Sequence, residues 1–180
     1  MSPDGVRGIR TPLLPPTMPA IPPTDIQEVF RHLPHRFPFV LVDAVEGGEA
    51  GEWIRAVKHV SVDEPFFTSV GVEKPAMPAT LIVEALAQAG GILCFFSGHL
   101  KPRGGSTTYL AVIDHTRVER EAYAGETIVL ECRLKRVLRG VIRIEGRASV
   151  GGELAVKTEL TVVVHDTDEA LAASDPRTIS

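Results

Sequence analysis

Cysteine is scarce in this sequence, and its few cysteines do not form a metal site. Only Cys94 and Cys132 occur among the 180 residues, and both fall in apolar segments without a metal-ligand spacing. Free buried thiols are typical of a reducing compartment, so we expect a cytoplasmic protein. The N-terminal segment contains Arg7 and Arg10 but lacks the apolar core of a signal peptide, which favours the same location.

The sequence also lacks a strong net charge and an uninterrupted apolar run. The formal net charge of −4 gives no broad electrostatic reason to expect nucleic acid or an anionic membrane as a partner. The longest apolar stretch, residues 81–96, is interrupted by Glu84, Gln88 and the pair Gly90-Gly91, which argues against a membrane span. The composition, 44% hydrophobic and 23% charged, is that of an ordinary globular protein.

Proline, by contrast, recurs too often near the N-terminus for a helix or a central strand. Residues 1–24, which include "PLLPPTMPAIPPT", are therefore predicted to form a flexible or polyproline arm outside the fold, with a docking arm as the alternative. Residues 25–166 are expected to form a single domain, since a chain of this size suits one hydrophobic core. Residues 167–180 are expected to be a frayed C-terminal tail.

The periodicity of the domain predicts one long helix and a set of strands. A short amphipathic helix over residues 25–33 precedes the strand "EWIRAVKHVSV", with a turn expected at Gly47-Gly48. Pro78 is placed to start a long helix over residues 79–96. Beyond it, "TTYLAVIDHTRVER", "TIVLECRL", "VIRIEGRASV" and "ELAVKTELTVVV" read as strands, with Gly151-Gly152 as a hairpin turn. We predict an α+β hotdog fold, a curved antiparallel sheet wrapped around one long central helix.

A narrow polar stripe runs along the long helix. Thr80, Glu84 and Gln88 follow one another at intervals of four residues, so they share one face. The stripe can simply face solvent, but apolar neighbours all round predict a helix that is buried on most sides. The helix start at Ala79-Thr80 offers unpaired backbone N–H groups that can polarise a carbonyl. An acid one turn inside such a start suits carbonyl or thioester chemistry, with Ala79, Thr80 and Gln88 as candidate substrate-binding residues.

Four stretches of the sequence together form a combination of motifs that is far more specific than any single short motif. They are "LPHRFPFVLVDAV" from Leu33, "EPFF" from Glu64, "PAMPATLIVEALAQ" from Pro75 and "YLAVIDHTRVEREAYAGETIVLE" from Tyr109. Over about residues 33–164 the chain resembles the hotdog 3-hydroxyacyl-acyl carrier protein dehydratases of bacterial fatty acid synthesis, the FabZ type.

The resemblance implies a catalytic pair of which this sequence keeps one member. In that family a glutamate on the central helix works with a histidine from the preceding loop of another subunit, and together they remove water from a 3-hydroxyacyl thioester. The glutamate corresponds to Glu84, whereas the histidine position is Val70, which cannot transfer a proton. The family's glycine after Met-Pro corresponds to Ala79, whose backbone N–H remains.

Other histidines do not replace the missing one by spacing. His35 belongs to the "PHR" segment, where we expect a structural role. Surface roles are expected for His59 and His99, and His115 follows "VID" at a strand position that leaves a minor catalytic alternative. The basic run "RLKRVLRGVIR" is expected to be a solvated face of two strands, with a dock for an acidic carrier protein as the alternative.

These observations lead to one hypothesis and a set of rivals. The hypothesis is a FabZ-like protein of fatty acid or polyketide synthesis that binds acyl thioesters but is non-catalytic alone or altered in its chemistry, as a homodimer, a trimer of dimers, or one half of a heterodimeric dehydratase. The rivals are an active dehydratase, isomerase or thioesterase that uses Glu84 with another group, and a pure interaction module. No cofactor or metal is expected. The substrate would be carried on the phosphopantetheine arm of an acyl carrier protein or on coenzyme A.

Overall fold

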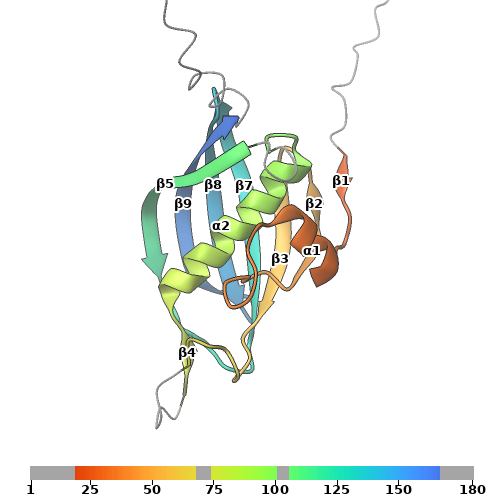
Figure 1. The fold of residues 1–180 in the computed structure, drawn as a ribbon. Helices are drawn as coiled ribbons and strands as arrows, with labels where there is room; N and C mark the ends of the chain where they lie inside the picture. Colours follow the sequence, from red (N-terminus) through yellow and green to blue (C-terminus); the bar gives the residue numbers. More distant parts are fainter. Residues whose placement is uncertain (1–18, 68–73, 101–105, 167–180) are drawn as a thin grey trace, which may run out of the picture.

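The computed structural model describes residues 19–67, 74–100 and 106–166, and an antiparallel sheet wraps around a long helix (Figure 1). The sheet has seven strands in the order β1-β2-β3-β7-β8-β9-β5. Their bounds are β1 Ala20–Ile21, β2 Ala44–Glu49, β3 Trp53–His59, β7 Thr127–Leu138, β8 Val141–Val150, β9 Glu153–Asp166 and β5 Ser106–Val118. The predicted α+β hotdog fold is confirmed within this part of the chain.

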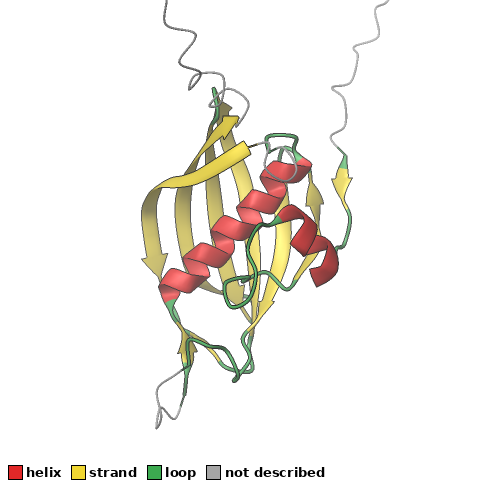
Figure 2. Ribbon diagram, in the orientation of Figure 1, coloured by secondary structure: helices red, strands yellow, loops and turns green. Residues whose placement is uncertain are grey.

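Two helices and a small strand pair complete the domain. The long helix α2 spans Ala79–Phe96, as predicted, and lies diagonally across the concave face of the sheet (Figure 2). The short helix α1, Ile26–His32, packs beside it and begins at Asp25, whose side chain accepts from the backbone N–H groups of Gln27 and Glu28. Strands β4, Ala76–Met77, and β6, Ala122–Tyr123, pair near the start of α2.

Two glycines let α2 approach the centre of the sheet closely. A Cβ atom at Gly90 would lie 2.9 Å from Ile144 Cδ1, and one at Gly146 would lie 3.2 Å from Leu86 Cδ1. The helix therefore sits directly on β8 at the middle of the core. By length and hydropathy α2 could cross a membrane, but 56% of that window is buried inside the fold, so it is a core helix.

The predicted alternation of the strands is also found. On β7, Ile128, Leu130 and Cys132 are fully buried, and their neighbours in the strand face outward. On β8 the buried set is Ile142, Ile144, Gly146, Ala148 and Val150. The turn between β8 and β9 is Gly151-Gly152, and both residues have positive φ, as a tight hairpin requires.

Two expectations near the N-terminus need correction. Residues 20–21 pair with β2, Ile21 is buried and Thr24 bridges to Val45, so the sheet begins before Asp25. Segments 1–18 and 167–180 lie outside the described residues.

The Gly47-Gly48 pair is not the turn but part of β2, where a bulge follows Val45, and the chain reverses at residues 50–52. A side chain at Gly48 would collide with the carbonyl oxygen of Trp53 across the hairpin, so the pair serves close strand packing.

The "EPFF" segment is tied to the sheet by a buried lysine. Lys58 on β3 is 5% exposed, and its Nζ lies 2.6 Å from Glu64 Oε1 and 3.3 Å from Asp43 Oδ2. A charge removed from water in this way is tolerated only because it is paired. The ion cluster fixes the chain shortly before it continues to α2.

Candidate functional site

The polar stripe of α2 becomes more deeply buried from the start of the helix toward its middle. Thr80 at its start is exposed, the Glu84 side chain is 23% exposed and Gln88 is 2% exposed. The alternative of a wholly solvated stripe is therefore excluded, and the expected burial of the helix on most sides is found. Glu84 stands at the boundary, where a carboxylate reaches both water and an apolar interior.

Gln88 uses its whole amide to hold Glu84 and the entry segment together. Its Nε2 donates to Glu84 Oε1 at 2.9 Å and to the carbonyl oxygen of Phe39 at 2.9 Å. Its Oε1 accepts from the backbone N–H of Leu41 at 2.8 Å. A buried amide that is satisfied in this way orients its partners. Gln88 supports the carboxylate and also lines the cavity beside it, so its role in binding substrate stays a prediction.

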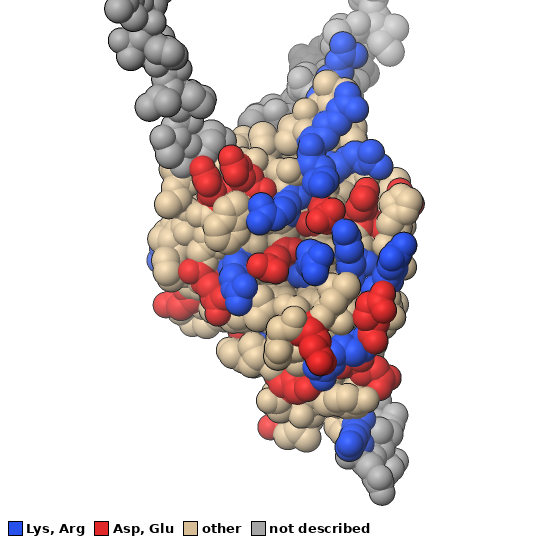
Figure 3. Space-filling view, turned by 180° about the vertical axis from the view of Figure 1, so that it is seen from behind, with Lys and Arg blue, Asp and Glu red and all other residues tan. Residues whose placement is uncertain are grey.

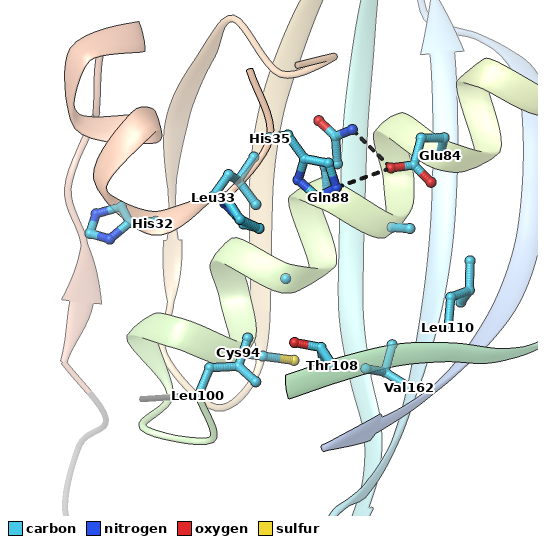
Figure 4. Close-up of a pocket in the computed structure, with 13 residues that line it drawn as sticks. His32, Leu33, His35, Glu84, Gln88, Cys94, Leu100, Thr108, Leu110 and Val162 are labelled. Carbon is cyan, nitrogen blue, oxygen red and sulfur yellow. Dashed lines mark hydrogen bonds and ion pairs between the residues drawn. The ribbon is translucent and has the colours of Figure 1, made fainter. Parts of the chain in front are cut away.

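The structure brings His35 beside Glu84, which the spacing of the sequence did not reveal. His35 Nε2 lies 3.6 Å from Glu84 Oε1, and the His35 side chain is 33% exposed (Figure 4). The backbone around it is held by Arg36, whose guanidinium donates to the carbonyl oxygens of Phe30, Leu33 and His35. A structural role was expected for His35. A titratable side chain in the segment after α1 was visible in the sequence, but the path of the loop was not.

A cavity of about 240 Å³ begins at this pair and follows α2 toward its C-terminal end. Three polar side chains, His35, Glu84 and Gln88, lie together at one end of the cavity (Figure 4). The rest of the lining is mostly apolar, with His32 and Thr108 as polar exceptions. Strands β5 and β9 close it from the side of the sheet edge. The lining residues are His32, Leu33, Pro34, His35, Glu84, Ala87, Gln88, Gly91, Cys94, Leu100, Thr108, Leu110 and Val162.

Burial alters two titratable groups that line this cavity. It raises the pKa of the Cys94 thiol to about 12, so this thiol is neutral and unreactive at ordinary pH. Burial also lowers the pKa of His32, whose ring packs against Phe95 and Phe96 at centroid distances of 4.4 and 4.6 Å. The cavity wall around these residues is therefore uncharged. Cys94 and Cys132 are both buried free thiols, as expected.

The remaining predicted residues are placed elsewhere. Pro78 precedes α2, and no side chain in the described part of the chain caps the helix, while the N–H groups of Leu81 and Ile82 donate to the Pro78 carbonyl oxygen. Polarisation of a carbonyl by the N–H groups at Ala79-Thr80 stays a prediction. Ala79 is half-buried and Thr80 exposed, but neither lines the cavity that holds Glu84. Val70, at the position of the family's histidine, lies outside the described residues.

His59, His99 and His115 do not line the cavity either. His59 is exposed, and its Nδ1 shares a hydrogen bond of 2.9 Å with Thr127 Oγ1. His115 is exposed on β5 in a left-handed conformation, with φ of 51°, where the register of β5 against β9 shifts. His99 follows the end of α2, and its backbone N–H donates to the carbonyl oxygen of Cys94.

Comparison with known proteins agrees with this geometry. Residues 33–159 match the model of the FabA-like domain. The chain is 42% identical over 142 residues to the 3-hydroxyacyl-[acyl-carrier-protein] dehydratase FabZ of Thiobacillus denitrificans, covering 79% of this chain and 98% of that protein. It is 47% identical over 136 residues to the enzyme of the same name from Proteus mirabilis, covering 75% of this chain and 89% of that protein.

Solved structures share the fold. The dehydratase heterocomplex ApeI:P from Xenorhabdus doucetiae aligns with a TM-score of 0.67 and 22% identity, over 81% of this chain and 95% of that chain. A hot-dog-like protein from Thermanaerovibrio acidaminovorans aligns with a TM-score of 0.54 and 20% identity, over 73% and 93%. At these identities the likeness concerns the fold alone, while the curated relatives identify the family. The chain belongs to the hotdog-fold 3-hydroxyacyl-acyl carrier protein dehydratases of the FabZ type, as its motifs predicted.

Proposed function

We propose that this protein binds 3-hydroxyacyl thioesters and acts in their dehydration with altered proton-transfer groups. A dehydratase-type role is supported by the family and by the names of the curated relatives. The observation that carries the finer proposal is Glu84, a carboxylate supported by Gln88 at the polar end of an otherwise apolar cavity. The altered chemistry is proposed because Val70 stands where the family has its histidine.

The cavity suits a 3-hydroxyacyl chain in its distribution of polar and apolar groups. The hydroxyl and thioester carbons would lie near Glu84, where hydrogen-bonding groups gather. The hydrocarbon tail would extend along α2 past Gly91 and Cys94 toward Leu100. Apolar walls with a few placed polar groups are the usual design of a small-molecule site. The carrier of the thioester would be an acyl carrier protein or coenzyme A.

We further propose that the protein works as an assembly of hotdog subunits joined along β5. This strand is the edge of the sheet, and it exposes Tyr109, Val112, Ile113 and Val118 by 57%, 42%, 51% and 54%. An exposed apolar edge strand is a template for pairing with another chain. The partner would be a second copy, with a trimer of dimers as the larger form, or a homologous subunit that retains a histidine. The cytoplasm remains the expected location.

The outer face of the sheet gives less support to carrier docking there. Arg133, Arg143 and Arg147 are exposed on this face, but acids lie among the basic residues (Figure 3). Lys135 and Lys157 both lie 3.6 Å from Glu145 Oε2. The sheet separates this surface from the cavity, which lies on the side of α2. We therefore infer that this part of the basic run is a solvated outer face of the sheet.

The binding proposal is tested by filling the cavity. A Cβ at Gly91 would meet no atom nearer than 3.7 Å, at Leu33 Cδ2, so Gly91→Leu should fold and occupy the space beside Cys94. Gln27→Leu adds the same side chain to an exposed position of α1 as a control. Titration calorimetry with (3R)-3-hydroxyacyl-coenzyme A thioesters should show binding to the wild type and the control, and at least tenfold weaker binding to Gly91→Leu. Equal binding by all three proteins would place the thioester elsewhere.

A further inference from the structure

We propose that His35 is the second proton-transfer group of the site, paired with Glu84 within one chain. The inference rests on the proposed function and names the residue that does the work of the histidine absent at position 70. It makes the pair independent of any partner subunit. The proposal also gives His35 a chemical role where sequence reasoning expected only a structural one.

The contact between the two side chains is the first support. His35 Nε2 faces Glu84 Oε1 across 3.6 Å, which is an ion-pair distance but too long for a good direct hydrogen bond. Each side chain can therefore still bond a small polar group placed between them, such as a substrate hydroxyl. Both side chains also line the same cavity, so a bound acyl chain would meet both.

The surroundings of the pair make Nε2 the reactive nitrogen of His35. Its Nδ1 is buried and has no hydrogen-bond partner among the described residues, so only Nε2 is directed at another titratable group. Glu84 Oε1 already accepts from Gln88, whereas Oε2 has no partner in the described part of the chain and can contact a substrate. In the proposed starting state of the reaction, Glu84 is the carboxylate and His35 is the imidazolium.

From this state Glu84 and His35 together can carry out the elimination without any other proton donor or acceptor. The Glu84 carboxylate takes the proton from C2 of the 3-hydroxyacyl thioester, and the electrons of that C–H bond form the C2=C3 double bond. The C3–O bond breaks with its electron pair on oxygen, and the His35 imidazolium donates its Nε2 proton, so that water leaves. Glu84 then holds a proton that passes to His35 across their contact. The products are a 2-enoyl thioester and water, and the pair returns to its first state.

The roles of His35 as acid and Glu84 as base can be distinguished by changing the leaving group of the substrate. A hydroxyl needs a proton to leave, whereas chloride does not. Loss of a general acid should therefore slow dehydration, typically by about 10²–10⁴-fold, but spare elimination of chloride. Loss of the base should slow both reactions.

The experiment compares wild type, His35→Gln, Glu84→Gln and the control His59→Gln on two substrates. These are 3-hydroxybutanoyl-coenzyme A and 3-chlorobutanoyl-coenzyme A, with enoyl thioester formation as the readout. His35→Gln should lose at least about a hundredfold in kcat on the hydroxy substrate, with KM little changed, and stay within a few fold on the chloro substrate. Glu84→Gln should be slow on both substrates, and His59→Gln should match the wild type.

Three results would overturn the assignment, and each is distinct from failure of the binding proposal. His35→Gln with full dehydratase activity would show that another group is the acid. Equal loss on both substrates would mean that His35 only maintains the shape of the site. A wild-type protein that binds the hydroxy substrate in calorimetry without converting it would leave the binding function in place but exclude the pair.

Discussion

Gln88 lies one helical turn beyond Glu84 on α2, and its amide nitrogen donates to the glutamate Oε1 over 2.9 Å. The same side chain accepts from the Leu41 N–H and donates to the Phe39 carbonyl oxygen, both in the segment that follows His35. One buried amide therefore fixes the carboxylate and the loop that carries its neighbour. The separation of His35 from Glu84 depends on this link.

Replacement of Gln88 by leucine should destabilise the fold. The Leu41 N–H would lose its partner in a buried place, where an unsatisfied group costs about 1–3 kcal/mol, and the Phe39 carbonyl oxygen would lose its partner in a partly buried one. Denaturant unfolding should show a loss of that order for Gln88→Leu. Gln27→Leu, the same change at an exposed site on α1, should stay within about 0.5 kcal/mol of the wild type. Equal stabilities of the two variants would show that the Gln88 contacts are of no energetic importance.

Stability should fall as the pH drops through the range of histidine titration, in part because of His32. Burial lowers the pKa of the folded His32, and Arg31 lowers it further while Glu28 opposes the shift. The unfolded chain therefore binds a proton that the folded chain resists, near the ordinary value of 6.5. The contribution of His32 is full above that pH and is lost as the pH falls below it.

The matched variant for this effect is His32→Phe, which keeps a ring against Phe95 and Phe96. Unfolding free energies measured between about pH 7.5 and 5.5 should decline less steeply for His32→Phe than for the wild type. Parallel curves would show that protonation of His32 is not linked to folding.

A charge on the sheet edge should disrupt assembly. Val112 is 42% exposed on β5, and a lysine there would place a charged side chain on the edge strand that is proposed to pair with another copy. Light scattering after size exclusion should show a dimer or larger form for the wild type and a monomer for Val112→Lys. Val62→Lys is the control, since Val62 is a 67% exposed residue away from the edge. An unchanged mass for Val112→Lys would exclude β5 as the interface.

Restoring the family's histidine should raise dehydratase turnover above that of the wild type. Val70→His adds the family's histidine to the proposed His35–Glu84 pair, and Val70→His combined with Glu84→Gln should not gain, because either histidine needs Glu84. The rescue should be partial: the family's Phe-Pro-Gly turn corresponds to Gly71, Val72 and Glu73, so the loop lacks the fixed proline φ. An error of about 1 Å in placement can cost roughly a hundredfold. A complete loop graft that folds without any gain would show that the defect extends beyond position 70.

The fold could be predicted from the sequence because local patterns of apolar residues and proline determine its helix and strands. Pro78 and the apolar run after it gave the bounds of α2, and the alternation on β8 gave its buried face. The Gly47-Gly48 turn was wrong because glycine marks both turns and close strand approach, and only the neighbouring strand distinguishes them. Glu84 was found as a lone acid among apolar residues.

His35 shows what the sequence could not give. Its contact with Glu84 joins residues that are far apart in the chain, and it depends on a loop path set by hydrogen bonds from Arg36 and Gln88. Spacing carries no information on such a path. The cavity has the same origin, since Leu110 and Val162 reach it through the pairing of β5 with β9.

The most direct test of the account is the rate at which the purified protein forms enoyl thioester from a (3R)-3-hydroxyacyl thioester, measured beside Glu84→Gln. The substitution keeps the size of the side chain and removes its proton transfer. We expect measurable turnover by the wild type, a loss of at least about a hundredfold in Glu84→Gln, and equal thioester affinity in calorimetry. Full turnover by Glu84→Gln, or a wild type that neither binds nor converts the thioester, would contradict the central claim that Glu84 serves a thioester site.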